Sequence, residues 1–359
     1  MDFEQLEKKY GNFLAPGFEI EVAGINLARE GMEIVSVSVE HVLNEADHFT
    51  FTINSAFDVA GQELRWIDSF LPAGKKVTIR MGYAETKPLM MVGIVTSIET
   101  RFPAGGTPQL EIGGFDLSHL LMKGMKPRSW DDIKHSDIAS RLALQDYGLK
   151  SAVDDTRVTY PKVMKPSGQS DYQFLQDLAR RNFYECFVFG ETLFFRSPAK
   201  DSEPVVTLRW HQNLISFNPE INLAGQVGEV EVRGWDPKAK KEIVGVAKVG
   251  DELGRRSGKS GGELIQGLTR ETIRENVRQP VYSQQEADLL AKSILNKHAE
   301  GLIKGTGETI GIPDILPGKT IRLEGLGKRF SKTYYIERAV HSIGASGYHT
   351  TFQIKENAI

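Results

Sequence analysis

Apolar and polar residues alternate with a period of two through much of the first third of the chain. The clearest examples are residues 35–40, 49–54 and 77–83. Because successive side chains of a β-strand point to opposite faces, each pattern predicts a half-buried antiparallel strand. Runs that favour turns, at 71–74 and 103–106, separate these segments. We therefore predict a tube-like β-barrel or sandwich domain over residues 1–118.

The middle third changes to the spacing of amphipathic helices. Ser136 is placed to cap one helix, and Ser170 opens a second helix in which Gln173 completes a capping box. The aromatic run at residues 187–195 surrounds a glycine-containing turn and predicts a β-hairpin. Together these elements predict a small α+β domain over residues 119–205.

The last part of the chain returns to strands. Short runs typical of strands occur at residues 230–233, 320–323, 334–337 and 351–355. One helix interrupts them, with Ser283 and Glu286 as its capping box. We predict a second tube-like β domain over residues 206–359, with a loop and helix excursion at about 238–298. Within it, the glycine-rich and charged stretch 238–279 is expected to be an excursion from the second β domain or a mobile loop.

The expected fold class is therefore mainly β with an α+β part, in which two tube-like β-barrel domains flank a small α+β domain. Composition agrees with a folded protein: of 359 residues, 40% are hydrophobic and 25% are charged. The net charge of −3 lacks the positive excess with which a sequence-independent nucleic-acid binder neutralises phosphates. We expect no nucleic-acid specificity.

The ends and apolar runs of the chain bear on its location. The N-terminal residues are charged, and no apolar run reaches the ~18 residues of a membrane span. We expect synthesis and assembly in the cytoplasm without membrane insertion, unless the chain leaves by a route that its sequence does not encode.

Cysteine and histidine residues do not suggest a metal site. Cys186 is the only cysteine, which rules out an internal disulfide, and its apolar surroundings predict a buried, unreactive thiol. His341 and His349 flank a predicted turn at 344–347 and are placed to face one another across a hairpin. Two imidazoles without a third ligand make a poor zinc site, so we expect structural or surface roles for them.

Two glycine-containing segments imitate nucleotide-binding motifs. The Gly-Lys-Ser at 258–260 needs a further glycine at the position of Leu253, but the nearest one is Gly254. Because the phosphate-binding backbone depends on that spacing, we interpret the segment as a solvated loop that includes Arg256 and Ser257. Residues 305–311 resemble a dinucleotide fingerprint loosely, and Pro313 follows where a helix should begin. A turn between strands is the better interpretation.

Motifs for nucleophilic or metal-assisted hydrolysis do not occur in the sequence. It has neither a Gly-x-Ser-x-Gly elbow nor a His-Glu-x-x-His helix. Its 47 acidic residues guarantee chance pairs, so no glycosidase pair can be nominated from sequence. We nominate no catalytic, cofactor-binding or metal-binding residue, expect no cofactor, and predict that the protein is not an enzyme.

Several stretches, in the same order along the chain, resemble the late control D protein family. They are the helix 170–179 with the aromatic hairpin after it, then 230–237, 311–318, 326–336, His341 and 347–352. Each stretch is of modest specificity, but together they span the chain from about residue 110 to its end. Lys332 stands where that family often has glycine, which affects only the expectation for the local turn.

The resemblance implies a mechanical role. The late control D family includes tail hub proteins of contractile phages and the hub portions of related secretion and extracellular injection systems. It implies a homotrimer whose two tube-like β domains per chain form a ring of six similar units, matching a sixfold inner tail tube on one side and a threefold spike on the other. The expected partners are other copies of the chain, the inner tail tube protein, other baseplate proteins and a separate spike protein. A separate spike is implied because the chain ends at Ile359, soon after the last predicted strand.

Three functional hypotheses follow from these observations. The first is a trimeric baseplate hub of a phage tail or injection particle, in which edge strands of both β domains pair across subunits because uncovered edges invite aggregation. The second is a tail-associated cell-wall hydrolase or glycan-binding protein, which would need two carboxylates across a cleft. The third is an adaptor that carries toxic cargo on the loop 238–279. A phage, a secretion system and an extracellular injector are all compatible with the sequence.

Overall fold

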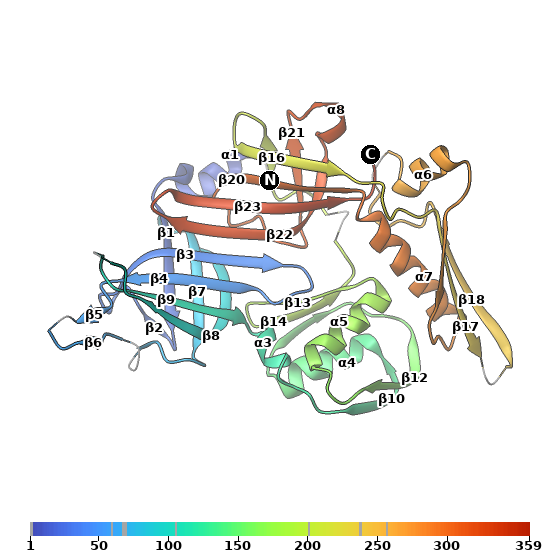
Figure 1. Ribbon diagram of the computed structural model, residues 1–359, viewed down its shortest axis with the longest axis horizontal. Helices are drawn as coiled ribbons and strands as arrows, with labels where there is room; N and C mark the ends of the chain where they lie inside the picture. Colours follow the sequence, from blue (N-terminus) through green and yellow to red (C-terminus); the bar gives the residue numbers. More distant parts are fainter. Residues whose placement is uncertain are drawn as a thin grey trace.

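The computed structural model describes residues 3–58, 60–66, 70–104, 106–199, 202–236, 239–255 and 258–359. Its main feature is a 13-stranded sheet, which we call the large sheet (Figure 1). Its strands are β1 (Pro16–Val22), β2 (Ile25–Asn26), β3 (Glu33–Val42), β4 (His48–Asn54), β7 (Lys76–Tyr83), β8 (Leu89–Arg101), β9 (Gln109–Asp116), β15 (Thr207–Arg209), β16 (Leu214–Ile221), β20 (Ile303–Ile310), β21 (Thr320–Glu324), β22 (Thr333–Gly344) and β23 (Gly347–Glu356).

Strands from both ends of the chain contribute to the large sheet. Its order is β16-β20-β23-β22-β3-β4-β9-β8-β7-β1-β2, with β21 pairing β22 and β15 pairing β21. The two halves are joined by β3 and β22, which pair antiparallel from Val37 opposite Ile343 to Val42 opposite Arg338. The sheet curls, so that β1 and β7 run nearly at right angles to β22 and β23 in Figure 1.

One hydrophobic core fills the concave side of the curled sheet. It contains residues from both halves of the chain, including Phe51, Ile79, Ile321 and Phe352. The rings of Tyr83 and Tyr348 stack at 5.5 Å across the two halves. The mainly β prediction is confirmed. Two separate barrels are not confirmed, because the two β regions share one sheet and one core.

The predicted alternation is confirmed in β4 and β7, where alternate side chains are buried. Strand β3 departs from it at one residue. Its pairing with β4 shifts between Ile34 and Ser36, and Val35 at this irregularity is 36% exposed, whereas Val37 and Val39 are buried. A β-bulge re-aims the side chains around it, which explains why Val35 does not share the buried face.

A second core belongs to what we call the α+β module, which follows β9. Its elements are α3 (Ser118–Leu121), β10 (Arg128–Lys134), α4 (His135–Arg141), a π-helical turn η2 (Leu142–Asp146), β11 (Lys150–Val153), β12 (Thr159–Lys165), α5 (Asp171–Asn182), β13 (Glu185–Phe189) and β14 (Thr192–Arg196). Strands β10 and β12 form one small sheet, and β11, β14 and β13 form another. The predicted hairpin is confirmed as β13–β14.

Of the two helix starts predicted in this module, one is confirmed and the other is not. Ser170 caps α5, and both hydrogen bonds of the capping box with Gln173 are present, as predicted. Ser136, however, lies inside α4, whose N-cap is Lys134 without a side-chain bond. The backbone N–H of Ser136 donates to the Thr156 hydroxyl at 3.2 Å. A tertiary contact therefore satisfies this helix end in place of the expected local cap.

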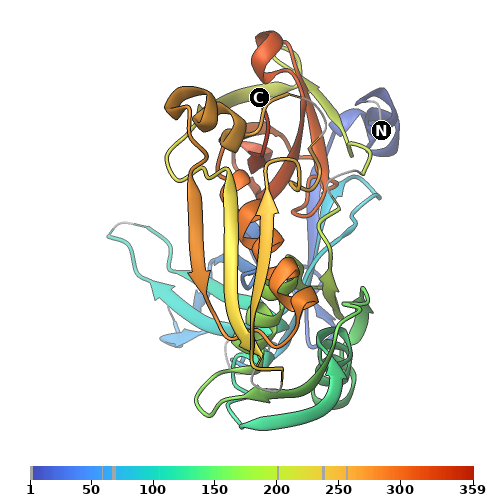
Figure 2. The ribbon, with the colours of Figure 1, turned by 90° about the vertical axis from the view of Figure 1, so that its right-hand side faces the viewer.

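A third unit, which we call the α7 module, has its own core. Its elements are β17 (Glu229–Asp236), β18 (Lys241–Lys248), α6 (Gly261–Thr269), β19 (Arg274–Arg278) and α7 (Gln284–Ala299). Figure 2 shows the three strands as an upright sheet with α7 behind them. Ser283 caps α7 as expected, but Glu286 reaches the backbone N–H of Tyr282 and not that of Ser283.

Of the two interpretations of 238–279, a mobile loop is wrong for the described residues, which leaves the excursion. Most of this stretch forms β18, α6 and β19, and the folded excursion begins earlier, at β17. Ile243 and Ala247 of β18 pack in the same core as Leu290 and Ala291 of α7, which explains why a glycine-rich, charged sequence folds here. Residues 237, 238, 256 and 257 lie outside the described part.

Short elements complete the chain. They are α1 (Phe3–Lys9), η1 (Gly11–Phe13), β5 (Phe57–Asp58), β6 (Glu63–Leu64) and α8 (Gly327–Phe330). Just after α1, the Tyr10 hydroxyl donates to Asp314, in the segment between β20 and β21, at 2.7 Å. Among the described helices, none combines the length and apolar character needed to cross a membrane.

Candidate functional site at the junction of the modules

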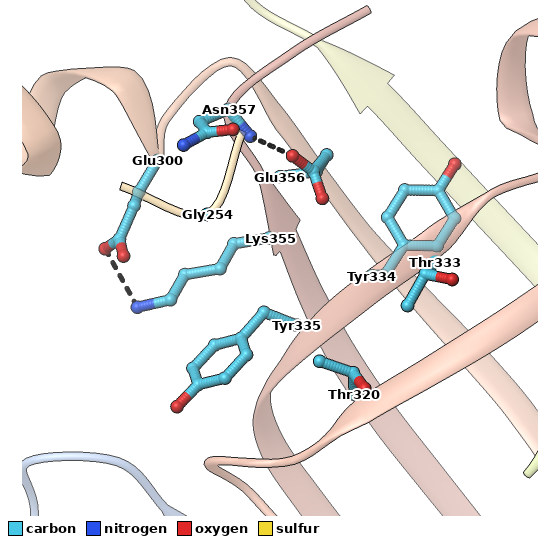
Figure 3. Close-up of a pocket in the computed structure, with 9 residues that line it drawn as sticks. All are labelled: Gly254, Glu300, Thr320, Thr333, Tyr334, Tyr335, Lys355, Glu356 and Asn357. Carbon is cyan, nitrogen blue, oxygen red and sulfur yellow. Dashed lines mark hydrogen bonds and ion pairs between the residues drawn. The ribbon is translucent and has the colours of Figure 1, made fainter. Parts of the chain in front are cut away.

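The large sheet, the α+β module and the α7 module meet around a buried lysine. The ammonium of Lys355, on β23, lies 2.9 Å from Glu300 Oε2, just after α7, and 3.7 Å from Glu337 Oε1 on β22. Figure 3 shows the Lys355 side chain running beside the ring of Tyr335 toward Glu300. The ammonium is 5.8 Å from the centre of that ring, within the range of a cation–π contact. The C-terminal strand is thereby tied to the end of α7.

The same cluster continues into the α+β module. The Tyr335 hydroxyl donates to Glu185 Oε1, on β13, at 2.6 Å. Glu185 Oε2 is 3.6 Å from Arg196 Nε on β14, and the Arg196 guanidinium donates to the Gly318 carbonyl at 3.0 Å. Because Glu185, Tyr335 and Lys355 are all buried, each polar group depends on the next for its partner.

Burial and charge act in opposite directions on this cluster. Burial disfavours the charged form of Lys355, but the carboxylates of Glu300 and Glu337 outweigh it, so the pKa of Lys355 is raised. Burial raises the pKa of Glu185, although the Tyr335 hydroxyl and Arg196 work against the increase. Burial and Glu185 both raise the pKa of the Tyr335 hydroxyl. At neutral pH Lys355 is therefore a cation and Tyr335 a neutral donor.

The cavity enclosed by the junction is too small for a substrate, but Glu300, Glu337 and Lys355 also line a wider cleft of about 800 Å³. The cavity beside Lys355 and Tyr335 measures about 10 Å³, which is close to the volume that one water molecule needs. What the arrangement provides is a fixed connection between three modules through paired charges that exclude water.

Two larger clefts flank helix α5 and are open to partners. One, of about 800 Å³, lies between α5 and α7 and has a basic lining that includes Arg180, Arg181 and Lys297. The other, of about 760 Å³, is lined by Met164 and Tyr282 among others. Both clefts lie between modules, and their volumes fall within the about 300–1,000 Å³ of small-molecule sites.

The two histidines singled out from the sequence do not face one another. His341 pairs with Thr350 across β22 and β23, whereas His349 pairs with Ser342, so the two rings lie on opposite faces. His341 is buried and hydrogen-bonds to the Ile315 carbonyl and the Tyr348 hydroxyl. Burial lowers the pKa of His341 to about 3, which keeps it neutral. No group of three or more potential metal ligands occurs in the described part of the chain.

The Gly-Lys-Ser segment is occupied by contacts within the chain. Ser260 caps α6 in a complete capping box with Glu263, so its hydroxyl and the N-terminal amide of the helix are used. The backbone of Lys259 exchanges hydrogen bonds of 2.9 and 3.0 Å with Ile359. The segment docks the C-terminus. The interpretation as a solvated loop agrees with Gly258 and Lys259, which are exposed, and is wrong for Ser260, which is buried. Arg256 and Ser257 lie outside the described residues.

The segment 305–311 is also not a turn. It forms most of β20, which pairs with β23 and places Gly307 opposite Phe352. A Cβ at Gly307 would lie 2.4 Å from the Phe352 ring, and one at Gly311 would lie 1.9 Å from the Tyr348 ring. The glycines therefore make space for aromatic rings, which a search for turn residues does not reveal.

Other groups considered from the sequence are used within the core. Cys186 is fully buried, as predicted, and burial raises the pKa of its thiol to about 12. Two neighbouring carboxylates, Asp47 and Asp116, resemble an acid pair, since burial and Asp47 raise the pKa of Asp116. Both are buried, and Asp47 accepts hydrogen bonds from His41 and the backbone of Val42, so this pair does not line an open sugar-binding cleft.

Sequence reasoning missed the residues of the junction itself. The only local signal is a charged residue at a position where the pattern is otherwise apolar. Glu185 begins an aromatic strand, and Lys355 follows the buried Ile354 and breaks the alternation of β23. Nothing local connects Lys355 to Glu300, which is 55 residues away.

Comparison with solved structures identifies the fold. The chain is similar to a 43 kDa tail protein of prophage MuSo2 from Shewanella oneidensis, with 10% identity, TM-score 0.71, and 95% of this chain and 98% of that chain covered. It is similar to a tail protein from Neisseria meningitidis, with 16% identity, TM-score 0.70 and coverage of 96% and 97%. An E. coli protein described as a component of the type VI secretion system matches with 10% identity, TM-score 0.56 and coverage of 90% and 73%. At these identities the likeness establishes the fold.

Sequence comparison adds one family. A search found no match among curated proteins. The model of the family described as Alg8 N-terminal domain matches residues 14–345, nearly the whole chain.

Proposed function

The chain belongs to the Alg8 N-terminal domain family, and from this premise and the fold we propose that it is a structural part of a phage tail or a related injection apparatus. One observation carries the proposal: the fold matches two tail proteins over almost the full length of both chains in each comparison. A match of that extent involves the arrangement of all three modules, not one common domain.

We propose more specifically that the protein is a trimeric baseplate hub between a sixfold tube and a threefold spike. The ordered resemblance to the late control D family, from about residue 110 onward, supports this assignment. The fold shared with a type VI secretion system component supports it as well. In this proposal the partners are other copies of the chain, the inner tube protein, a separate spike protein and other baseplate proteins, and the protein has no catalytic role.

Self-association through a sheet edge has a structural basis. Strand β16 is the end strand of the large sheet and pairs along its length with β20. Ile215 of β16 is 48% exposed, so the strand offers both backbone groups and an apolar side chain to another subunit. Closing such edges into a symmetric ring removes the aggregation hazard of an open sheet.

The junction around Lys355 suits a part that bears force. A hub has to keep its modules in a fixed relation while neighbouring parts are assembled on it. Buried, paired charges hold one geometry strictly because a shifted arrangement would leave a charge without a partner.

Light scattering of the purified full-length chain tests the proposal. We expect a particle of three times the chain mass of 40.0 kDa, either alone or with tube and spike proteins added. The same tube and spike proteins should be captured in pull-downs. A chain that stays monomeric in every mixture and captures neither protein would contradict the hub assignment.

A matched pair of variants locates the interface. Ile215→Lys places a charge on the exposed edge strand, whereas Leu268→Lys places the same charge on α6, at a residue that is 70% exposed. We expect Ile215→Lys to abolish the trimer while circular dichroism remains unchanged, and Leu268→Lys to leave the trimer intact. An Ile215→Lys trimer of normal stability would exclude β16 from the interface.

A further inference from the structure

A small pocket, separate from the cavity beside Lys355, opens where the β3–β4 turn meets the β13–β14 hairpin. It measures about 200 Å³, and the segment before β21 closes its third side. We call it the His41 pocket. The residues that matter here are His41, Phe187, Phe189, Phe194, Arg196 and Lys319.

His41 lines this pocket and has a buried ring nitrogen without a hydrogen-bond partner. Its Nδ1 lies 2.6 Å from Asp47 Oδ2, and because a carboxylate only accepts, the hydrogen of the bond belongs to Nδ1. The other oxygen of Asp47 accepts the backbone N–H of Val42 at 2.9 Å, which fixes the carboxylate. His41 is 2% exposed, yet its Nε2 has no hydrogen-bond partner among the described residues. A buried polar atom without a partner is unfavourable, and a bound group that reached this nitrogen would remove that cost.

The walls of the pocket combine aromatic rings with positive charge. Phe187 and Phe194 stack at 5.0 Å, and the Arg196 guanidinium lies 5.3 Å from the Phe187 ring centre. Burial lowers the pKa of Lys319, and Asp314 acts against this decrease. Basic groups outnumber acidic ones in the lining, which has Arg196 and Lys319 against Asp47, and Glu185 lies 3.6 Å from Arg196 Nε.

We propose that the His41 pocket binds the C-terminal residue of a partner protein, with an apolar side chain against the phenylalanines and its free carboxylate at Lys319, Arg196 and His41 Nε2. The pocket is smaller than the about 300–1,000 Å³ of small-molecule sites, so it takes one residue and not a passing segment. Only a terminal residue carries an apolar side chain and a carboxylate together. Capture of a chain end by cationic and polar groups is an established way of recognising peptides.

The proposal can be tested with a minimal probe on the full-length chain. N-acetylphenylalanine carries the apolar ring and the carboxylate, and N-acetylphenylalanine amide is its uncharged control. We expect calorimetry to show binding of the acid at least tenfold tighter than binding of the amide. With ¹⁵N-labelled histidine, the acid should shift the His41 imidazole signals and leave those of the exposed His349 unchanged.

Variants assign the contacts within the pocket. Lys319→Gln should weaken binding of the acid at least tenfold, whereas Lys328→Gln, which removes a fully exposed lysine on α8, should not change it. His41→Asn retains a donor for Asp47 but lacks Nε2, so it should keep the melting temperature and lose affinity. Because Lys319 is partly exposed, its variant remains informative even if His41→Asn does not fold.

Three results would overturn the proposal. Equal binding of the acid and the amide would show that the pocket does not recognise a carboxylate. An unchanged affinity in Lys319→Gln would show that Lys319 does not contribute to binding. An amidated peptide with an internal Phe-Asp sequence serves as the alternative ligand. If it binds more tightly than N-acetylphenylalanine, the pocket recognises an internal acidic segment and not a chain end. None of these results depends on whether the chain forms trimers, so failure here leaves the hub proposal intact.

Discussion

Two buried lysine–carboxylate pairs occur in different regions of this molecule, and their surroundings differ. Lys165 pairs with Asp171 inside the α+β module, where the two side chains are 0% and 1% exposed. Lys355 pairs with Glu300 between modules, where the side chains are 9% and 16% exposed. The first pair has further partners nearby, since Lys165 also donates to the Gly124 carbonyl at 2.6 Å and the Tyr147 hydroxyl donates to Asp171 at 2.5 Å.

The two pairs therefore stabilise different parts of the protein. Lys165 and Asp171 lie six residues apart and form together with their module, so their loss removes part of that module's interior. Lys355 and Glu300 belong to units with separate cores, so their loss weakens a connection and leaves each core intact. The same chemistry therefore stabilises a fold in one region and fixes a geometry in the other.

The largest effect is expected from breaking the interior pair. Lys165→Met leaves Asp171 buried without its cation, which should destabilise the protein by about 3–5 kcal/mol in denaturant unfolding. Lys162→Met, at an exposed position on the same strand β12, is the matched control and should change little. Adding Asp171→Leu to Lys165→Met should recover much of the loss; if it does not, the unpaired charge is not the cause.

Acid titration compares the α+β module with the large sheet through one buried histidine in each. Burial lowers the pKa of His135, in the α+β module, and that of His341, in the large sheet, to about 3. Both histidines bind protons more weakly in the folded protein than in the unfolded chain. Their contribution to the stability of the fold is therefore fully present above pH ~6.5 and is lost as the pH falls from there toward 3. Through each histidine, the free energy of unfolding should fall by up to about 1.4 kcal/mol per pH unit, or by about 2 kcal/mol between pH 6.5 and 5.

The variant His341→Gln should reduce this pH dependence, and His349→Gln, at a partly exposed position on β23, should not. Unfolding followed at several pH values provides the measurement. If His341→Gln leaves the change of the free energy of unfolding with pH unaltered, the folded protein already accommodates a protonated His341.

Breaking the junction pair should have a smaller and more local effect. Lys355→Met should cost about 1–3 kcal/mol, less than Lys165→Met because its carboxylate partners reach water more easily. Hydrogen exchange should increase at the end of α7 and in β23, with the interior of the α+β module unchanged. Lys304→Met, on the exposed side of β20, is the control. Uniformly faster exchange across all modules would show that the junction is not a boundary.

The smallest effects are expected at the helix caps. Ser170→Ala and Ser260→Ala each remove a capping-box hydroxyl and should each cost about 1 kcal/mol. Ser170→Ala should act on the α+β module alone. Ser260→Ala should in addition loosen the C-terminus, because Lys259 holds Ile359. Limited proteolysis of the C-terminal residues separates the two; equal release in both variants would count against the docking role of residues 258–260.

Elements with a local signal could be predicted from the sequence alone. Period-two alternation identified β4 and β7, the Ser170–Gln173 spacing identified the start of α5, and the aromatic run identified the β13–β14 hairpin. These features depend on neighbours a few residues apart, because strand faces and caps are set by the geometry of the backbone itself.

The way in which these elements are joined could not be predicted from the sequence and is seen in the tertiary structure. The pairing of β3 with β22 merges the two β regions into one sheet, and their aromatic core accounts for the glycines of β20. Lys355 with Glu300, and His41 with Phe189 and Lys319, meet from distant parts of the chain. A strand's edge accepts many partners and a buried charge needs only some opposite charge, so the choice among them is made by packing of the whole core, which no local pattern encodes.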